Sequence, residues 1–321
     1  MTSAAQVSNP AAGSLERRLL FVLGRADDMR AEVYVRLAEG AGDGSECVVT
    51  GTLTGPRCSL ATTLPATVRL MDLAGSRPPT ARGIMTEPAY WTPEMPNLYQ
   101  LDAKADTGGA EFHCERLVGL RRLGVRGTSL WLDGRRWVPR GIGCEAAMLD
   151  MPSLHAASSA AVVSEPSAAV CDAADAAGVA LIAETNRGLD VGVLQDRLLQ
   201  WSQHPAVVMT VVPLAEAANA PGLRSVLGTM LLAVEVDGSD PPPPPPAGID
   251  CLVVVIASGQ SPHPAWRVAA PTLPLMARRK AGAGLPVHRQ ACDALQADLA
   301  AWSCDGSASA PPRDWAGYLV T

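Results

Sequence analysis

The sequence predicts an immunoglobulin-like β-sandwich followed by a shortened (β/α)₈ barrel of the TIM type. Up to about residue 125, apolar and polar residues alternate with period two, which is typical of half-exposed antiparallel strands. Beyond residue 129, continuously apolar runs alternate with helical stretches, which indicates a parallel sheet covered by helices. We expect a disordered leader at residues 1–14, the sandwich at 15–127 and the barrel at 128–321.

Composition and charge exclude several classes of protein. The chain has 321 residues, of which 48% are hydrophobic and 18% charged, so it is globular and not disordered. A net charge of −6 and an isoelectric point near 5.4 argue against a nucleic-acid partner. No apolar run reaches the roughly 18 residues of a membrane helix, and the apolar stretch 19–23 is too short for a signal peptide. We therefore expect a cytoplasmic protein with no membrane contact.

The eight cysteines indicate neither a zinc ribbon nor a disulfide framework. They are widely spread, and no pair has the CxxC spacing of a zinc site. Searches for a phosphate-binding loop, a dinucleotide fingerprint, HExxH and GxSxG find nothing. We therefore predict reduced, mostly buried thiols, no metal and no cofactor.

The first part contains clear strand and turn signals. Val33, Val35 and Leu37 alternate with polar neighbours, and several such strands over about 110 residues favour a sandwich. Asp133-Gly134 stands between two apolar runs and predicts a two-residue hairpin turn of type I′, because Gly tolerates positive φ.

The barrel prediction rests on eight apolar runs. Helical patterns lie between several of them, at residues 167–177, 194–203 and 287–302, and Gly178 suits the position after a helix. The region 129–321 is shorter than the about 250 residues of a usual barrel, so some helices must be short or missing. The proline run 241–246 cannot be helix interior and is expected to form a polyproline loop. The predicted strands are 138–144, 160–163, 179–183, 206–212, 232–236, 251–256, 272–276 and 316–320.

Five motifs in order resemble glycoside hydrolase family 2, the family of β-galactosidase, β-mannosidase and β-glucuronidase relatives. They are residues 90–99 (YWTPEMPNLY), 118–121 (VGLR), 130–141 (LWLDGRRWVPRG), 170–178 (VCDAADAAG) and 201–209 (WSQHPAVVM). The resemblance covers roughly residues 33–209 and continues more faintly to the C-terminus. We expect this chain to lack the jelly-roll domain that usually begins this family.

The resemblance implies hydrolysis by two carboxylates at the carboxyl ends of the barrel strands. One protonates the glycosidic oxygen and the other attacks the anomeric carbon, about 5–5.5 Å away in retaining enzymes. Glu216 lies one residue later than the family's Asn-Glu pair, where this chain has Leu214 and Ala215. Glu184 ends a predicted strand and is the second candidate. Glu216 can alternatively be a solvated loop residue, and Glu184 a hydrogen-bonded rim residue.

The nucleophile that the resemblance implies is missing. The corresponding late strand, residues 273–282, offers Arg278, Arg279 and Lys280 but no carboxylate, and a cation opposes an oxocarbenium-like centre. We interpret this basic segment as a solvated loop, with an anionic ligand or a partner as the alternative. The family's R-x-S-H-x-P segment reads AVVSEP at residues 161–166, so its Arg and His are also lost.

Further candidates are weaker. Glu145, Trp266 and Trp315 are candidate sugar-binding residues at the barrel rim, with a solvated loop or the core as the alternative. His204 precedes a strand and is interpreted as structural. Asp172 and Asp175 lie on a predicted helix and are interpreted as a cap and a surface charge.

These patterns together favour a catalytically degenerate relative of the family, a pseudoenzyme that acts as a carbohydrate-binding, scaffold or interaction module. The first alternative is an active retaining glycosidase in which Glu216 and Glu184 are rearranged. The second is a structural subunit that buries the barrel mouth against a protein partner.

Overall fold

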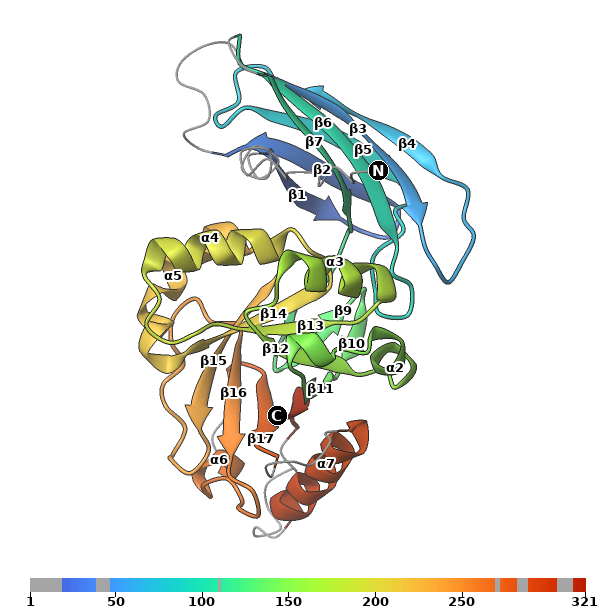
Figure 1. Cartoon of the computed structure of the whole chain (residues 1–321). Coiled ribbons are helices and arrows are strands. Elements are labelled where there is room, and N and C mark those ends of the chain that lie inside the picture. Colours follow the sequence, from blue (N-terminus) through green and yellow to red (C-terminus); the bar gives the residue numbers. More distant parts are fainter. Residues whose placement is uncertain (1–18, 39–46, 109–110, 269–271, 282–287, 305–313) are drawn as a thin grey trace, which may run out of the picture. The chain divides into compact units, whose positions relative to one another are not determined.

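The computed structural model describes residues 19–38, 47–108, 111–268, 272–281, 288–304 and 314–321 (Figure 1). The predicted leader, residues 1–14, lies outside the described residues. The chain divides into two compact units. One comprises Met1–Ala89 and Asn97–Leu120, and the other Tyr90–Pro96 and Arg121–Thr321.

The first unit is a curled antiparallel sheet of seven strands in the order β1-β2-β5-β4-β3-β6-β7. In β2, residues Ala31, Val33, Val35 and Leu37 are buried and alternate with more exposed neighbours, as the period-two pattern predicts. The assignment of this sheet to an immunoglobulin-like sandwich stays a prediction. The strands are β1 (Leu19–Ala26), β2 (Arg30–Leu37), β3 (Val48–Arg57), β4 (Ala66–Asp72), β5 (Thr80–Thr86), β6 (Leu98–Asp106) and β7 (Glu111–Val118).

A small sheet opens the second unit. It has the order β10-β9-β8 and contains β8 (Leu123–Arg126), β9 (Ser129–Leu132) and β10 (Arg135–Trp137). Asp133 and Gly134 join β9 to β10 with φ of 48° and 76°. Both values are positive, as a type I′ turn requires, so the predicted hairpin is confirmed.

The remaining eight strands form a closed barrel in which all neighbours are parallel, which confirms the predicted barrel. Most of their residues are buried, because the outside of a parallel barrel is covered by helices and its inside is filled with side chains. The strands are β11 (Arg140–Gly143), β12 (Ala160–Ser164), β13 (Leu181–Glu184), β14 (Val207–Pro213), β15 (Leu231–Asp237), β16 (Cys251–Ile256), β17 (Leu275–Arg279) and β18 (Gly317–Val320).

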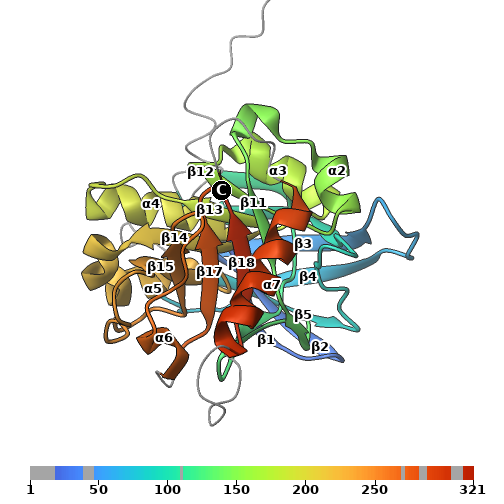
Figure 2. The same cartoon turned by 90° about the horizontal axis from the view of Figure 1, so that it is seen from below.

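The helices cover the barrel unevenly. Helix α3 ends at Gly178, whose φ of 70° is the left-handed cap predicted from the sequence. Helix α7 contacts β11 and β18 (Figure 2). Between β15 and β16 every residue is described and none is helical, so the prolines 241–246 do replace a helix. The helices are η1 (Ala146–Met148), α2 (Met151–Ala156), α3 (Ala168–Ala177), α4 (Val191–Ser202), η2 (Leu214–Asn219), α5 (Ala220–Leu227), α6 (Ala265–Val268) and α7 (Arg289–Cys304).

The predicted position of the seventh barrel strand is wrong by three residues. It was expected at residues 272–276, but β17 spans Leu275–Arg279. Pro274 has no N–H to donate to the neighbouring strand, although its carbonyl accepts a hydrogen bond from Leu252 N at 3.0 Å. The pairing therefore begins after Pro274, and the two arginines 278 and 279 belong to the strand.

Because all eight barrel strands are parallel, their carboxyl ends meet at one end of the barrel, called the mouth below. Side chains that end or follow these strands are therefore candidates for the functional site. None of the described helices is both long and apolar enough to cross a membrane.

Candidate functional site at the barrel mouth

A buried arginine joins two carboxylates at the mouth. Arg278 on β17 donates from Nη1 to Glu235 Oε2 at 2.8 Å and to Glu184 Oε1. Its Nε donates to Thr321 Oγ1 at 2.9 Å. Glu184 ends β13, and Glu235 lies near the end of β15. Since both carboxylates accept from the same nitrogen, they are close neighbours across the mouth. We call these three residues the mouth triad.

The mouth triad corrects one interpretation of the sequence. Arg278 and Arg279 were expected in a solvated basic loop, but both belong to β17, and the Arg278 side chain is only 10% exposed. The neighbouring Arg279 is paired with the exposed Asp298 of α7 at 2.5 Å. Burial of a guanidinium requires paired and hydrogen-bonded surroundings, and Glu184 and Glu235 supply them.

Glu216 lies on the 3₁₀-helix η2, directly after β14. Glu216 is 8% exposed, and its Oε1 accepts a hydrogen bond from Gly188 N at 2.9 Å. Its Oε2 is buried and has no hydrogen-bond partner. It is therefore not a solvated loop residue. The register of β14 against β13 also contains one extra residue, Val208, so a bulge lies in the strand that leads to Glu216.

A pocket of about 430 Å³ opens beside the mouth triad. Glu216 and Glu235 both line it, so the fold brings one predicted carboxylate and one triad carboxylate to the same cavity. Exposed Lys280 and Arg187 supply positive charge, and Asp237 adds a third carboxylate. Hydrogen bonds from Ser239 lower the pKa of Asp237, so this carboxylate is anionic at neutral pH. The other lining residues are Gly188, Pro213, Leu214, Ala215, Val236 and Val255.

The predicted sugar-binding residues are not gathered at this pocket. Glu145 is exposed and precedes η1 after β11. Trp266 and Trp315 are almost completely buried, and Trp266 Nε1 donates to Asp240 O at 2.8 Å. Because a stacked sugar needs an open ring face, neither indole offers a platform in this structure.

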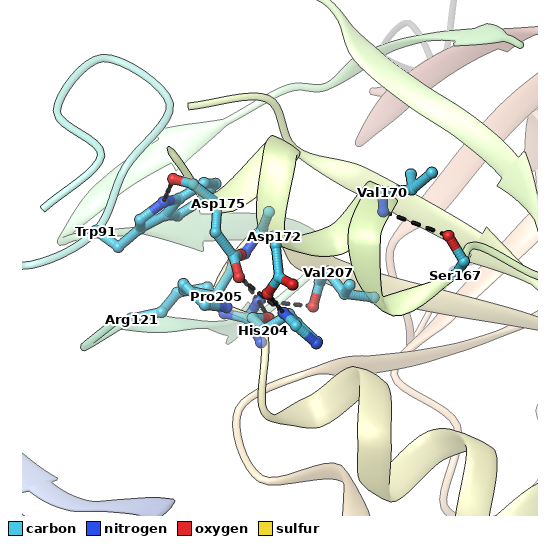
Figure 3. Close-up of polar contacts among 10 residues, drawn as sticks. Trp91, Arg121, Ser167, Val170, Asp172, Asp175, His204, Pro205 and Val207 are labelled. Carbon is cyan, nitrogen blue, oxygen red and sulfur yellow. Dashed lines mark hydrogen bonds and ion pairs between the residues drawn. The ribbon is translucent and has the colours of Figure 1, made fainter. Parts of the chain in front are cut away.

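A buried polar network lies before β14, at the opposite end of the barrel (Figure 3). Asp175 accepts from Ala206 N at 2.7 Å and pairs with His204 Nδ1 at 2.8 Å. Arg121 donates from Nη1 to Pro205 O at 2.5 Å and to Val207 O at 2.6 Å. Asp175 is therefore not the surface charge expected from the sequence, whereas His204 has the expected structural environment.

Burial shifts the pKa values of two residues in this network. It lowers the pKa of Arg121 to about 10, against the attraction of Asp175, and it raises the pKa of Asp175 against the hydrogen bonds of His204 and Ala206. His204, Asp175 and the exposed Asp172 have ligand atoms within 4.8 Å of one another, which is the spacing of a metal site. His204 Nδ1 and Asp175 Oδ2 already form a hydrogen bond with each other, and Asp175 also accepts from Ala206 N. These bonds give His204 and Asp175 a structural role that needs no metal ion.

Sequence reasoning missed Glu235 and the role of Arg278. A signal for Glu235 was present, because it is the single carboxylate at the carboxyl end of an otherwise apolar run, residues 232–236. Arg278 and Glu235 are 43 positions apart in the chain and lie on different strands, so no local sequence pattern encodes their contact.

The fold is similar to those of solved β-glucuronidases. A β-glucuronidase from Bacteroides uniformis matches 94% of this chain and 45% of its own length, with a TM-score of 0.61 and 15% identity. The β-D-glucuronidase from Dictyoglomus thermophilum matches 94% of this chain and 61% of its own length, with a TM-score of 0.61 and 13% identity. The Bifidobacterium dentium β-glucuronidase in complex with coumarin-3-O-glucuronide matches 94% of this chain and 59% of its own length, with a TM-score of 0.60 and 14% identity.

These likenesses establish the fold. The chain spans less than two thirds of the length of each of these three structures. No family model matches the sequence, and no curated protein is similar to it.

Proposed function

We propose that this chain is a glycoside hydrolase-like protein that has lost the hydrolytic carboxylate pair and binds carbohydrate at the barrel mouth. The single observation that carries the proposal is the mouth triad. Arg278 lies on the seventh strand of the barrel, where the resemblance implies the nucleophile. Its guanidinium is the partner of the two carboxylates that would otherwise be free to act, Glu184 and Glu235.

The chemistry of glycoside cleavage opposes a cation at this place. Positive charge develops at the anomeric carbon in the transition state, and the site must supply negative charge to stabilise it. Here the guanidinium already compensates Glu184 and Glu235, and it would repel the developing charge. A carboxylate that is hydrogen bonded to Arg278 is also a poorer nucleophile than an unpaired one.

The pocket beside the triad suits a ligand rich in hydroxyl groups. Its volume of about 430 Å³ lies within the range of small-molecule sites. Glu216 and Asp237 offer acceptors to sugar hydroxyls, and the buried Glu216 Oε2 gains a partner when a ligand hydroxyl donates to it. Lys280 and Arg187 provide cations for an acidic sugar, the ligand type seen in the Bifidobacterium dentium complex.

Two measurements on the purified chain test the proposal. Hydrolysis of aryl β-glucuronides, β-galactosides, β-glucosides and β-mannosides is expected to be absent. Glucuronic acid and the neutral sugars are titrated by calorimetry, and Glu216→Gln is expected to weaken binding about fivefold, since it replaces one charged acceptor by a neutral group. The matched control is Glu111→Gln, an exposed residue of the other unit. Turnover that Glu216→Gln abolishes would refute the proposal.

A second candidate function is retaining hydrolysis by rearranged carboxylates. The observation that favours it is the closeness of Glu184 and Glu235 at Arg278, together with the shared pocket of Glu216 and Glu235. In this alternative Glu216 is the acid and Glu184 the nucleophile, and substrate must displace Arg278. Arg278→Ala would then raise the hydrolysis rate, and Glu184→Gln would remove it. The structural-subunit alternative rests on the sequence alone.

A further inference from the structure

A second pocket lies at the end of the barrel opposite to the mouth. It has a volume of about 250 Å³ and is built where β11, β12 and β13 begin. We call it the amino-end pocket. It is separate from the carboxylates of the mouth, because parallel strands place their two ends on opposite sides of the barrel. Its lining includes Glu94, Trp137, Pro139, Arg140, His155 and Ser159.

One polar group of this pocket lacks a partner. Ser159 is only 5% exposed, and its Oγ is buried without a hydrogen bond. Leaving a buried hydroxyl unsatisfied is unfavourable, so such groups ordinarily have a protein, water or ligand partner. A hydroxyl both donates and accepts, and its natural complement is another hydroxyl group.

The residues around Ser159 can accommodate the ring of a small ligand. The half-buried Trp137 indole and Pro139 supply apolar surface, and an indole can stack on the C–H face of a pyranose. His155 is oriented by its Nδ1, which lies 3.3 Å from Gly178 O. Gly178 lets the backbone approach Pro93 closely at the side of the pocket, because a Cβ there would lie 2.4 Å from Pro93 O.

Charge selects against an acidic ligand. Arg140 is the cation that lines the pocket, and its guanidinium is already occupied by Val138 O at 3.1 Å, by Asp293 at 3.2 Å and by Gln296. It also stacks on the Tyr318 ring at 4.8 Å. Glu94 is exposed at the pocket and repels an anion.

We propose that the amino-end pocket binds a single neutral hydroxylated ring, such as one sugar unit of a glycan, stacked on Trp137 and hydrogen bonded to Ser159 Oγ. The volume supports one ring, since 250 Å³ lies just below the about 300–1,000 Å³ of drug-sized sites. This site would let the protein hold a glycan at a point distant from the mouth, whether or not the mouth binds sugar.

The test uses the full chain labelled with 5-fluorotryptophan and observed by ¹⁹F NMR. The chain has seven tryptophans, and Trp137→Phe identifies the resonance of the pocket indole. The probes are methyl β-D-glucopyranoside, methyl β-D-galactopyranoside and methyl α-D-mannopyranoside, with cyclohexanol as a ring with one hydroxyl. At least one glycoside is expected to shift the Trp137 resonance, and cyclohexanol to bind about tenfold more weakly.

Paired serine variants give the decisive comparison. Ser159→Ala is expected to weaken glycoside binding about five- to tenfold, the loss of one buried hydrogen bond. Ser303→Ala also removes a buried unpartnered hydroxyl, but on α7 and away from the pocket lining, and it should leave the affinity unchanged. The proposal is overturned if no glycoside moves the Trp137 resonance, if Ser159→Ala binds as the parent does, or if cyclohexanol binds equally well. Glu216→Gln should not affect this resonance, so failure here is distinct from failure at the mouth.

Discussion

Arg278 is the residue that joins the two carboxylates of the mouth triad. Its side chain is 10% exposed, and those of Glu184 and Glu235 are 24% and 28% exposed, so the arginine is buried and the carboxylates are partly shielded from water. Two carboxylates so close together repel each other unless a cation lies between them. Arg278 thus stabilises the carboxyl ends of β13 and β15.

Arg278→Gln is expected to lower the free energy of unfolding by about 1–3 kcal/mol. Breaking a fully buried pair costs about 3–5 kcal/mol, and the partial exposure of the carboxylates reduces this figure. Denaturant unfolding measures the change. Arg279→Gln is the matched control, because its partner Asp298 is 60% exposed, and it should cost below about 1 kcal/mol.

The double variant Arg278→Gln with Glu235→Gln provides the complementary result. Removing one carboxylate relieves the repulsion that the first substitution creates, so part of the lost stability should return. Equal stability losses for Arg278→Gln and Arg279→Gln would contradict the structural role assigned to the mouth triad.

At the scale of elements, the α3 cap shows how one glycine joins a helix to the barrel. Gly178 takes a left-handed conformation with φ of 70° and lies against Pro93 O, after which the chain enters β13. The helix ends there because the next residues, Val179 and Ala180, are buried and lead into the strand. The position therefore requires both positive φ and the absence of a Cβ.

Gly178→Ala should lower the free energy of unfolding by more than Gly127→Ala. Gly127 has φ of 58° but open space around it, so its substitution measures the conformational cost alone, about 1–2 kcal/mol. At Gly178 the clash with Pro93 O adds to that cost, and we expect a total of about 3 kcal/mol. Thermal unfolding of the two variants gives the comparison, and equal losses would remove the steric argument.

At the scale of the whole molecule, the closed barrel should unfold as one unit. Every strand of a closed barrel has two neighbours, so no strand can leave without breaking two ladders. Buried cysteines report this directly. Cys171, Cys251 and Cys292 are buried in the barrel unit, whereas Cys304 at the end of α7 is exposed.

Alkylation by iodoacetamide at pH 8 should modify Cys304 in the native protein and spare the three buried thiols. Burial raises the pKa of Cys292 from 9.0 to about 11, so the reactive thiolate is scarce. With added urea, mass spectrometry should find Cys171, Cys251 and Cys292 reactive over the same concentration range. Different ranges would mean that the barrel opens in parts.

The same shift predicts the direction of a pH effect. Because the folded-state pKa of Cys292 is raised, its contribution to stability is complete below pH 9 and is lost as the pH rises toward 11. Cys292→Ala should therefore show a flatter decline of stability than the parent between these pH values.

Local patterns predicted much of the fold. Continuous apolar runs at residues 251–256 and 160–163 correspond to β16 and β12 within one residue, because buried parallel strands need apolar side chains on both faces. The Asp133-Gly134 hairpin and the Gly178 cap were also predictable, since each rests on the allowed φ of single residues. The position of β17 was predicted three residues too early, because the predicted run 272–276 includes Pro274, which has no N–H to donate to a ladder.

The sequence by itself determined that eight apolar strands would form a barrel and that residues 273–282 contain no carboxylate, because both follow from residue type and order along the chain. Only the tertiary structure decided which groups the arginines of this segment contact. The contact of Arg278 with Glu184 and Glu235, and the buried state of Glu216 and Ser159, arise from barrel closure, which brings distant strand ends together. Such contacts are properties of three-dimensional distance and burial, and periodicity along the chain carries no record of them.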